Sequence, residues 1–167
     1  HPALAELRAA FPKALLAGCS TSGEISGERV QDDSFAATYI EFVSTHVVGK
    51  EVSINNVEAS EEAGRELISK LDPAGLKHVF VLSDGLNVNG TSLVKGMRDA
   101  LPAKVAVTGG LAGDGPDFQK TFVVNSKGEA CDKIITAVGF YGNDLNVGHG
   151  SLGGWDTFGR GLLGRKS

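Results

Sequence analysis

The sequence of 167 residues is poor in cysteine, in long apolar runs and in clustered basic charge. Two cysteines, Cys19 and Cys131, are too few for a disulfide framework and fit a reducing compartment. No apolar stretch is long enough to span a bilayer and no signal peptide opens the chain, so we expect a cytoplasmic protein with no membrane partner. The net charge of −4, with no basic block larger than Arg165-Lys166, argues against a nucleic-acid partner.

The spacing of Cys and His residues does not suit zinc, so we predict no metal site. The first residue is not Met, so we expect the chain to be an excerpt. What the sequence does contain is enough apolar residues, 41%, for one sizeable domain. It also contains 23 glycines, a number well above average usage, and several of them cluster in turns.

Apolar periodicity predicts helices and strands along the chain. Residues 2–11 form a predicted helix that Pro12 ends, with Leu4 and Leu7 on the same face as Phe11. Ser60 is the predicted N-cap of a second helix, with two glutamates in its first turn. The remaining predictions are a helix from Thr91 to Leu101, buried strands at 14–17, 78–82 and 105–107, antiparallel strands at 35–42 and 47–54, and a hairpin arm at 121–124 with its turn at 126–128.

The second half of the chain repeats the first. Subtracting 90 from the positions of the apolar residues Val94, Met97 and Leu101 gives Leu4, Leu7 and Phe11. The same offset places Gly113 on Gly23 and Asp114 on Glu24, and further along the offset grows to 100. We therefore expect an α/β (α+β) domain with a mixed sheet, built from two copies of a helix, strand, Gly-acid turn and antiparallel strands, with helices packed on the sheet. Because a strand precedes the second copy, we also expect one before the first, outside this chain.

The two glycine-rich turns do not suit a phosphate-binding loop. Such a loop runs straight into a helix, whereas the residues after Gly23 and Gly113 are strand-like and no Lys follows. A small anion-binding nest of backbone amides stays open. Glu24 and Asp114, at equivalent places beside these glycines, either hold their own turns or pair with a ligand cation.

The loop from Ser83 to Gly90 leaves the carboxyl end of a buried strand and enters a helix, which is where α/β sheets bind ligands. Asp84, Asn87 and Asn89 are its polar candidates. The alternative is that Asn89 only caps the helix and Asp84 only forms the turn.

Cys19, at the end of a predicted strand, could also act as a catalytic thiol. Its only candidate base is His149, and no third member can be named, so a small buried cysteine is the alternative that the residues favour. Trp155 is either packed over the core or covers a pocket.

Three separated motifs carry a family resemblance: residues 18–24 (GCSTSGE), residues 109–114 (GGLAGD), and the ending from His149-Gly150 through Gly154-Trp155 to Phe158-Gly159. In this order they resemble the FIST N-terminal domain. The resemblance implies a bacterial intracellular sensory module that senses small molecules, amino acids being the usual suggestion. Some members resemble haem-binding nitric oxide sensors. It also implies a following FIST C-terminal domain and an output through a histidine kinase, a cyclic-di-GMP enzyme or a chemoreceptor. This chain departs from the pattern at both ends, since the leading strand and the C-terminal partner domain are absent.

We therefore expect residues 1–159 to form a FIST N-like sensory domain and residues 160–167 to begin a linker. The predicted function is binding of a small zwitterionic ligand, with no catalysis and no resident cofactor. The helix end near Asn89 would bind the carboxylate and an acidic side chain the ammonium. The predicted site residues are Ser20, Thr21, Glu24, Asp84, Asn87, Asn89, Asp114, His149 and Trp155. Two alternatives stay open: a haem-binding nitric oxide sensor with a His or Cys ligand, and a thiol-dependent acyl hydrolase using Cys19 and His149.

Overall fold

The computed structural model describes residues 2–150 and contains a four-stranded mixed sheet. The strands lie in the order β3 (His46–Ser53), β8 (Ile134–Tyr141), β4 (Leu76–Ser83) and β5 (Ala106–Leu111). The pairs β3–β8 and β8–β4 are antiparallel, and β4–β5 is parallel, with Val79 opposite Val107. This confirms the mixed α/β fold, and the strands predicted at 47–54, 78–82 and 105–107 are all present. The internal duplication stays a prediction.

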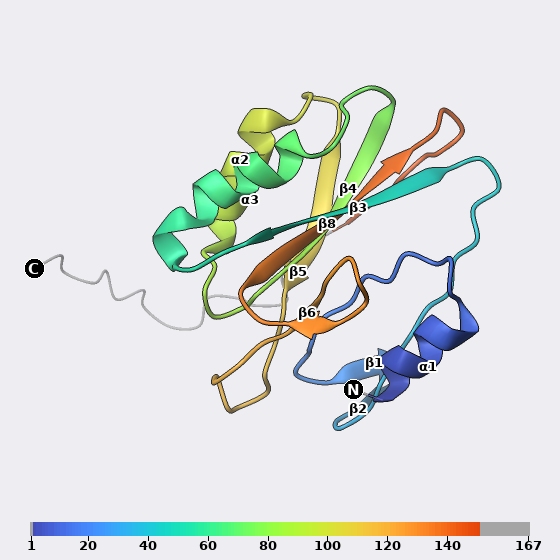
Figure 1. The fold of residues 1–167 in the computed structure, drawn as a ribbon, viewed down its shortest axis with the longest axis vertical. Coiled ribbons are helices and arrows are strands. Elements are labelled where there is room, and N and C mark those ends of the chain that lie inside the picture. The colour runs from blue at the N-terminus through green and yellow to red at the C-terminus, as the bar shows by residue number, and fades with distance from the viewer. Residues whose placement is uncertain (1, 151–167) are drawn as a thin grey trace, which may run out of the picture.

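Two helices cover one face of the sheet (Figure 1). They are α2 (Ser60–Ser69) and α3 (Gly90–Ala100), and their apolar side chains meet those of the strands in a single buried core. The core includes Leu67, Met97, Val79 and Ile135, each fully buried. The two helices touch through glycine, since a Cβ at Gly96 would lie 1.9 Å from the carbonyl oxygen of Glu61. The α2–α3 contact therefore depends on the absence of a side chain.

The helix starts differ in part from the prediction. Ser60 is not the N-cap of α2: a 3-10 turn, η1 (Val57–Ala59), precedes the helix, and Asn56 caps that turn by accepting from the Ala59 amide at 3.0 Å. The Ser60 hydroxyl donates instead to Val57 O at 2.6 Å. The extra turn places Ser60 inside the helix, so that its oxygen also accepts from Asn89 N. Asn89 is the N-cap of α3 and accepts from the Ser92 amide at 3.0 Å.

The first 45 residues fold less regularly. The helix predicted at 2–11 is present as α1 (Pro2–Ala10), and a short exposed hairpin pairs β1 (Glu24–Ser26) with β2 (Arg29–Gln31). The strands predicted at 14–17 and 35–42 are wrong, because neither segment joins a ladder. Their apolar side chains pack individually: Leu15 lies on Gly49 of β3, and Phe42 meets Phe140 of β8 edge to face.

The predicted hairpin arm is confirmed by the antiparallel pair β6 (Val123–Val124) and β7 (Ala130–Cys131), joined by a turn at Asn125–Glu129. The chain near Cys19 pairs with this hairpin through one isolated bridge, Cys19 to Val123. Among residues 2–150, no helix combines the length and apolarity needed to cross a membrane. Trp155 and the boundary expected at residue 159 lie outside the described residues.

Candidate functional site

The two Gly-acid turns are in direct contact. The Gly113 amide donates to the Ser20 carbonyl at 2.9 Å, and the Gly115 amide donates to the Ser22 hydroxyl at 3.2 Å. A Cβ at Gly113 would lie 2.6 Å from that hydroxyl oxygen, so only glycine fits there. The turn that follows β5 therefore lies against the segment that leads into Glu24.

The loop after β4 packs against the second turn. The Gly85 amide donates to the Thr121 hydroxyl at 3.0 Å, and a Cβ at Gly85 would lie 2.0 Å from the Ala112 carbonyl oxygen. At the start of α3, Gly90 faces the side chain of Leu111, the last residue of β5. Three loops therefore form one continuous surface at the carboxyl ends of the parallel strands β4 and β5.

Asp84 is buried, with 1% of its surface exposed, and both carboxylate oxygens accept hydrogen bonds. One oxygen accepts from the Leu86 amide at 2.8 Å and from the Asn87 amide at 2.7 Å, and the other accepts from the Lys133 amide at 2.9 Å. Burial raises the pKa of Asp84, but the bonds from Asn87, Lys133 and Leu86 outweigh it and hold the pKa below its usual value. This arrangement favours the turn-forming role for Asp84.

Glu24 is held by two hydroxyl groups. Thr21 and Ser34 each donate to one of its carboxylate oxygens at 2.6 Å, and these bonds, Ser34 first, lower the pKa of Glu24. The side chains form a polar cluster at the mouth of the β1–β2 hairpin. Glu24 is therefore an anion at neutral pH.

Asp114 holds its turn with one oxygen only. That oxygen, Oδ2, accepts from the Lys120 and Gln119 amides at 2.8 Å each, and these two bonds lower the pKa of Asp114. The other oxygen, Oδ1, has no hydrogen-bond partner within residues 2–150. Two ionised carboxylates thus lie on contacting turns, and one of them keeps an acceptor available.

Ser20 joins the first turn to the hairpin. Its hydroxyl oxygen accepts from the Phe122 amide at 2.9 Å, and its own amide donates to the Phe122 carbonyl at 2.9 Å. Thr21, next to it, is exposed. Asn87 is half-buried, and its side-chain amide donates to Asp84 at 3.1 Å, which leaves its carbonyl oxygen free to accept.

His149 acts on His78 of β4. Burial chiefly, and next the Coulombic influence of His149, lower the pKa of His78. No hydrogen bond joins His149 to Cys19 within the described residues, and burial raises the pKa of the Cys19 thiol. The raised pKa disfavours the thiolate of Cys19 at neutral pH.

Sequence reasoning missed three contributors to the site: Thr121, Ser22 and Ser34. Thr121 is 2% exposed and positions Gly85, but inside an apolar hairpin arm it gives no signal. Ser34 was concealed by the wrong strand prediction that begins beside it. Ser22 lies within the glycine-rich motif, and its sequence context does not distinguish it from the neighbouring Ser20 and Thr21.

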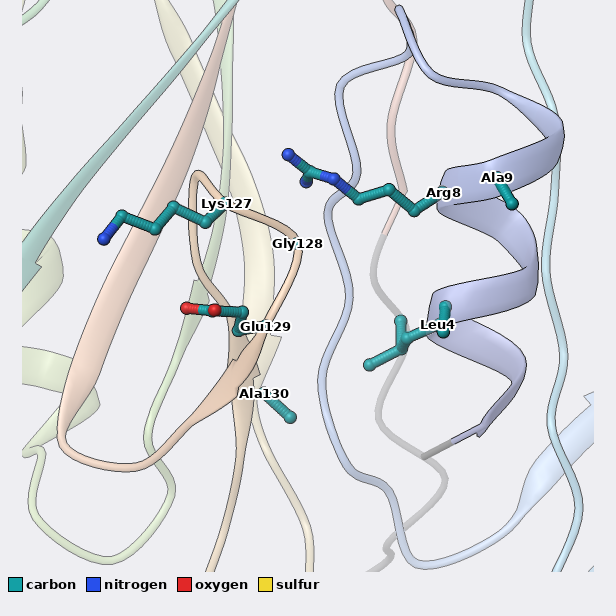
Figure 2. A pocket seen from close by; sticks show the side chains of 8 residues that line it. Leu4, Arg8, Ala9, Lys127, Gly128, Glu129 and Ala130 are labelled. Atoms are coloured by element: carbon teal, nitrogen blue, oxygen red, sulfur yellow. The ribbon is translucent and has the colours of Figure 1, made fainter.

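Two clefts lie away from these loops, on either side of α1. One of about 550 Å³ opens between α1 and the β6–β7 turn and is lined by Leu4 and Arg8 on the helix and by Lys127 and Gly128 on the turn. Figure 2 shows the Arg8 side chain extending toward the turn. A smaller one of about 300 Å³ lies on another side of α1, next to Phe35. Neither cleft is lined by a predicted site residue.

Taken together, a mixed sheet and polar loops gathered at the ends of its parallel strands define an α/β domain, and such strand ends are where α/β sheets commonly bind ligands. The FIST N domain model matches residues 1–163. The chain therefore belongs to the FIST N domain family, a family of sensory domains in signalling proteins. No curated protein matches the chain. Within residues 2–150, no group of three or more His, Cys, Asp and Glu side chains could hold a metal ion.

Proposed function

We propose that this domain is the input module of a cytoplasmic signalling protein and binds a small ligand with an ammonium group, an amino acid or a similar metabolite. The observation that carries the proposal is the contact between Gly113 and Ser22. It brings together two turns that each bear an ionised carboxylate, Glu24 and Asp114. An ammonium group is the complement of such a pair, and Asp114 Oδ1 is the acceptor that protein groups leave unused.

The carboxylate of the ligand would bind at the start of α3. The first two amides of that helix, at Gly90 and Thr91, have no intrahelical partner and lie at its positive end. Ser20, Thr21 and Asn87 would add hydrogen bonds, and Asp84 and Asn89 would hold the loop in position. We also propose Trp155 as a cover for the ligand, and His149 as part of a pocket wall.

Signalling would follow from a shift in population. A ligand that contacts both turns favours the conformation in which the turns touch. It can shift the equilibrium between this conformation and others only by as much as its affinities for them differ. The proposed receivers are a FIST C-terminal domain and, beyond it, a histidine kinase, a cyclic-di-GMP enzyme or a chemoreceptor. This assignment rests on family membership.

A thermal-shift screen of the twenty amino acids tests the proposal. A ligand present at a hundred times its Kd stabilises the folded state by about 2.7 kcal/mol, a readily measured rise in Tm. The screen should include, for each hit, the matching amine and the matching carboxylic acid. We expect the amino acid to give the larger shift because each partial ligand lacks one of the two charges.

A matched pair of variants locates the site. Asp114→Asn removes the charge but keeps an acceptor for the turn. It should weaken the affinity for the ligand at least tenfold, which is about 1.4 kcal/mol of binding free energy, and so reduce the ligand-dependent rise in Tm. Asp117→Asn removes a charge from an exposed neighbour in the same loop and should leave the shift unchanged. Equal loss in both variants, or no hit in the screen, would overturn the proposal.

A further inference from the structure

Two large apolar side chains stay exposed on either side of Asp114 in the sequence. Leu111, the last residue of β5, is 50% exposed, and Phe118, in the turn after Asp114, is 75% exposed. Asp114 between them is ionised, and its Oδ1 atom has no hydrogen-bond partner within the described residues. An available carboxylate oxygen is therefore bordered by apolar surface in both directions along the chain.

Leu111 is exposed because no side chain covers it at the start of α3. The alternation of a strand directs Leu111 to the same side as Val107, which packs against the core beneath the helices. Gly90, the first residue of α3, has no side chain, and a Cβ added there would lie 3.7 Å from Cδ1 of Leu111. The exposed side chain of Leu111 therefore borders the helix start at which the proposed ligand would place its carboxylate.

Phe118 has a backbone conformation that a bulky side chain disfavours. Its φ is +50°, in the left-handed region where aromatic residues are uncommon. The amides of Gln119 and Lys120 both donate to Asp114 Oδ2 at 2.8 Å and so close the turn on this conformation. Such strain persists only where the surrounding structure enforces it, and strained residues cluster at binding sites. The turn therefore keeps an exposed aromatic ring next in sequence to an amide that binds the Asp114 carboxylate.

We infer that the ligand is an amino acid with an apolar side chain, and that Leu111 and Phe118 determine this specificity. The inference rests on the proposed function and narrows it to one class of ligand. Leu111 and Asp114 are three residues apart, a span of at most about 10 Å, so a ligand that binds Asp114 and the start of α3 lies against Leu111. An apolar side chain there removes apolar surface from water on both partners. A polar side chain would lose its hydration without gaining a hydrogen bond.

A series of free amino acids that differ only in the side chain tests the inference, with each Kd measured by calorimetry on the purified protein. Each methylene group moved from water into apolar contact strengthens binding by up to about fourfold, so the affinity should increase from alanine to valine to leucine. Asparagine, which is close to leucine in size but polar, should bind about tenfold more weakly than leucine. Tighter binding of asparagine than of leucine would overturn the inference and leave the proposed function standing, whereas binding of no amino acid would overturn both.

Two variants and a matched control assign the preference to these residues. Leu111→Ser should reduce the ratio of leucine affinity to asparagine affinity about fourfold, because it removes apolar contact and leaves Asp114 in place. Phe118→Gly should reduce the same ratio without lowering the Tm of the free protein, because glycine adopts a positive φ readily. Val94→Ser removes a side chain of α3 that is 44% exposed and should leave the ratio unchanged. An unchanged ratio in Leu111→Ser or in Phe118→Gly, or an equal reduction in Val94→Ser, would overturn the inference.

Discussion

Asp84 is the residue on which the loop after β4 depends most. Its buried carboxylate collects amides from two loops, since Leu86 and Asn87 lie in its own turn and Lys133 precedes β8. An asparagine at this position would turn an amide group toward one of these donors. A buried N–H group that loses its acceptor destabilises the folded state by more than the hydrogen bond had stabilised it.

We therefore expect Asp84→Asn to lower the free energy of unfolding by about 2–3 kcal/mol, as measured by urea denaturation at pH 7. Asp144→Asn, which changes an exposed carboxylate, is the matched control and should alter it by less than about 0.5 kcal/mol. Equal effects of the two substitutions would show that the Asp84 hydrogen bonds do not hold the loop.

His78 makes the stability of the domain depend on pH. The ring is 4% exposed, its Nε2 lies 2.8 Å from the Thr108 hydroxyl, and its Nδ1 is buried without a partner among the described residues. Burial, and next the charge of His149, lower the pKa of His78 below its ordinary value of 6.5. The unfolded chain therefore binds the proton more tightly than the folded chain.

It follows that neutral His78 makes its full contribution to the free energy of unfolding above pH 6.5, and that the free energy of unfolding decreases as the pH falls below this value. Melting curves between pH 8 and pH 5 should show this decrease. His78→Gln should reduce the decrease, whereas His46→Gln, at an exposed position, should preserve it. A Tm that rises on acidification would contradict the sign.

Cys19 tests the thiol alternative. Because burial raises the pKa of its thiol, little thiolate forms at neutral pH. In a Cys131→Ser background, iodoacetamide should label Cys19 more slowly than it labels glutathione at pH 7. Labelling faster than glutathione would restore the thiol chemistry that the structure disfavours.

At the scale of elements, the sequence predicted best those that join a ladder or the core. The strands around Val79, Val107 and Val47 and the helix containing Met97 were found because periodicity and burial agree there. The predictions at 14–17 and 35–42 failed because apolar, β-branched residues indicate a strand only where a partner strand lies alongside. A local pattern does not contain that information. The same limit applies to Ser60, where an added turn capped by Asn56 moved the helix start.

The contact between α2 and α3 is the element-scale feature most sensitive to substitution. Gly96→Ala would place a Cβ 1.9 Å from the Glu61 carbonyl oxygen, so the helices must separate. We expect a loss of about 2–3 kcal/mol in the free energy of unfolding. Gly110→Ala is the control, because the added Cβ would meet no atom within 4 Å apart from its chain neighbours. It should leave the free energy of unfolding nearly unchanged. Similar values for both would mean that the helices are not in close contact.

At the scale of the whole molecule, the repeat offset singled out the two Gly-acid turns, which the structure brings into contact, while the duplication itself stays a prediction. It could not predict how each polar group is used. Asp84 and Asn89 hold their own loop, and Asp114 does so with one oxygen only, because backbone amides bind whichever acceptor the fold brings within reach. The Coulombic influence of His149 on His78 is a long-range interaction that the glycine-rich neighbourhood of His149 does not encode.

The central claim is that a ligand with an ammonium group binds where the two turns touch. The most direct test is an NMR titration of the labelled protein with the amino acid that gives the largest thermal shift. We predict that the amide shifts change most at Ser20, Ser22, Gly113 and Asp114, with a common Kd. Changes concentrated on α1 and residues 127–130, or no saturable change at any amide, would contradict the account.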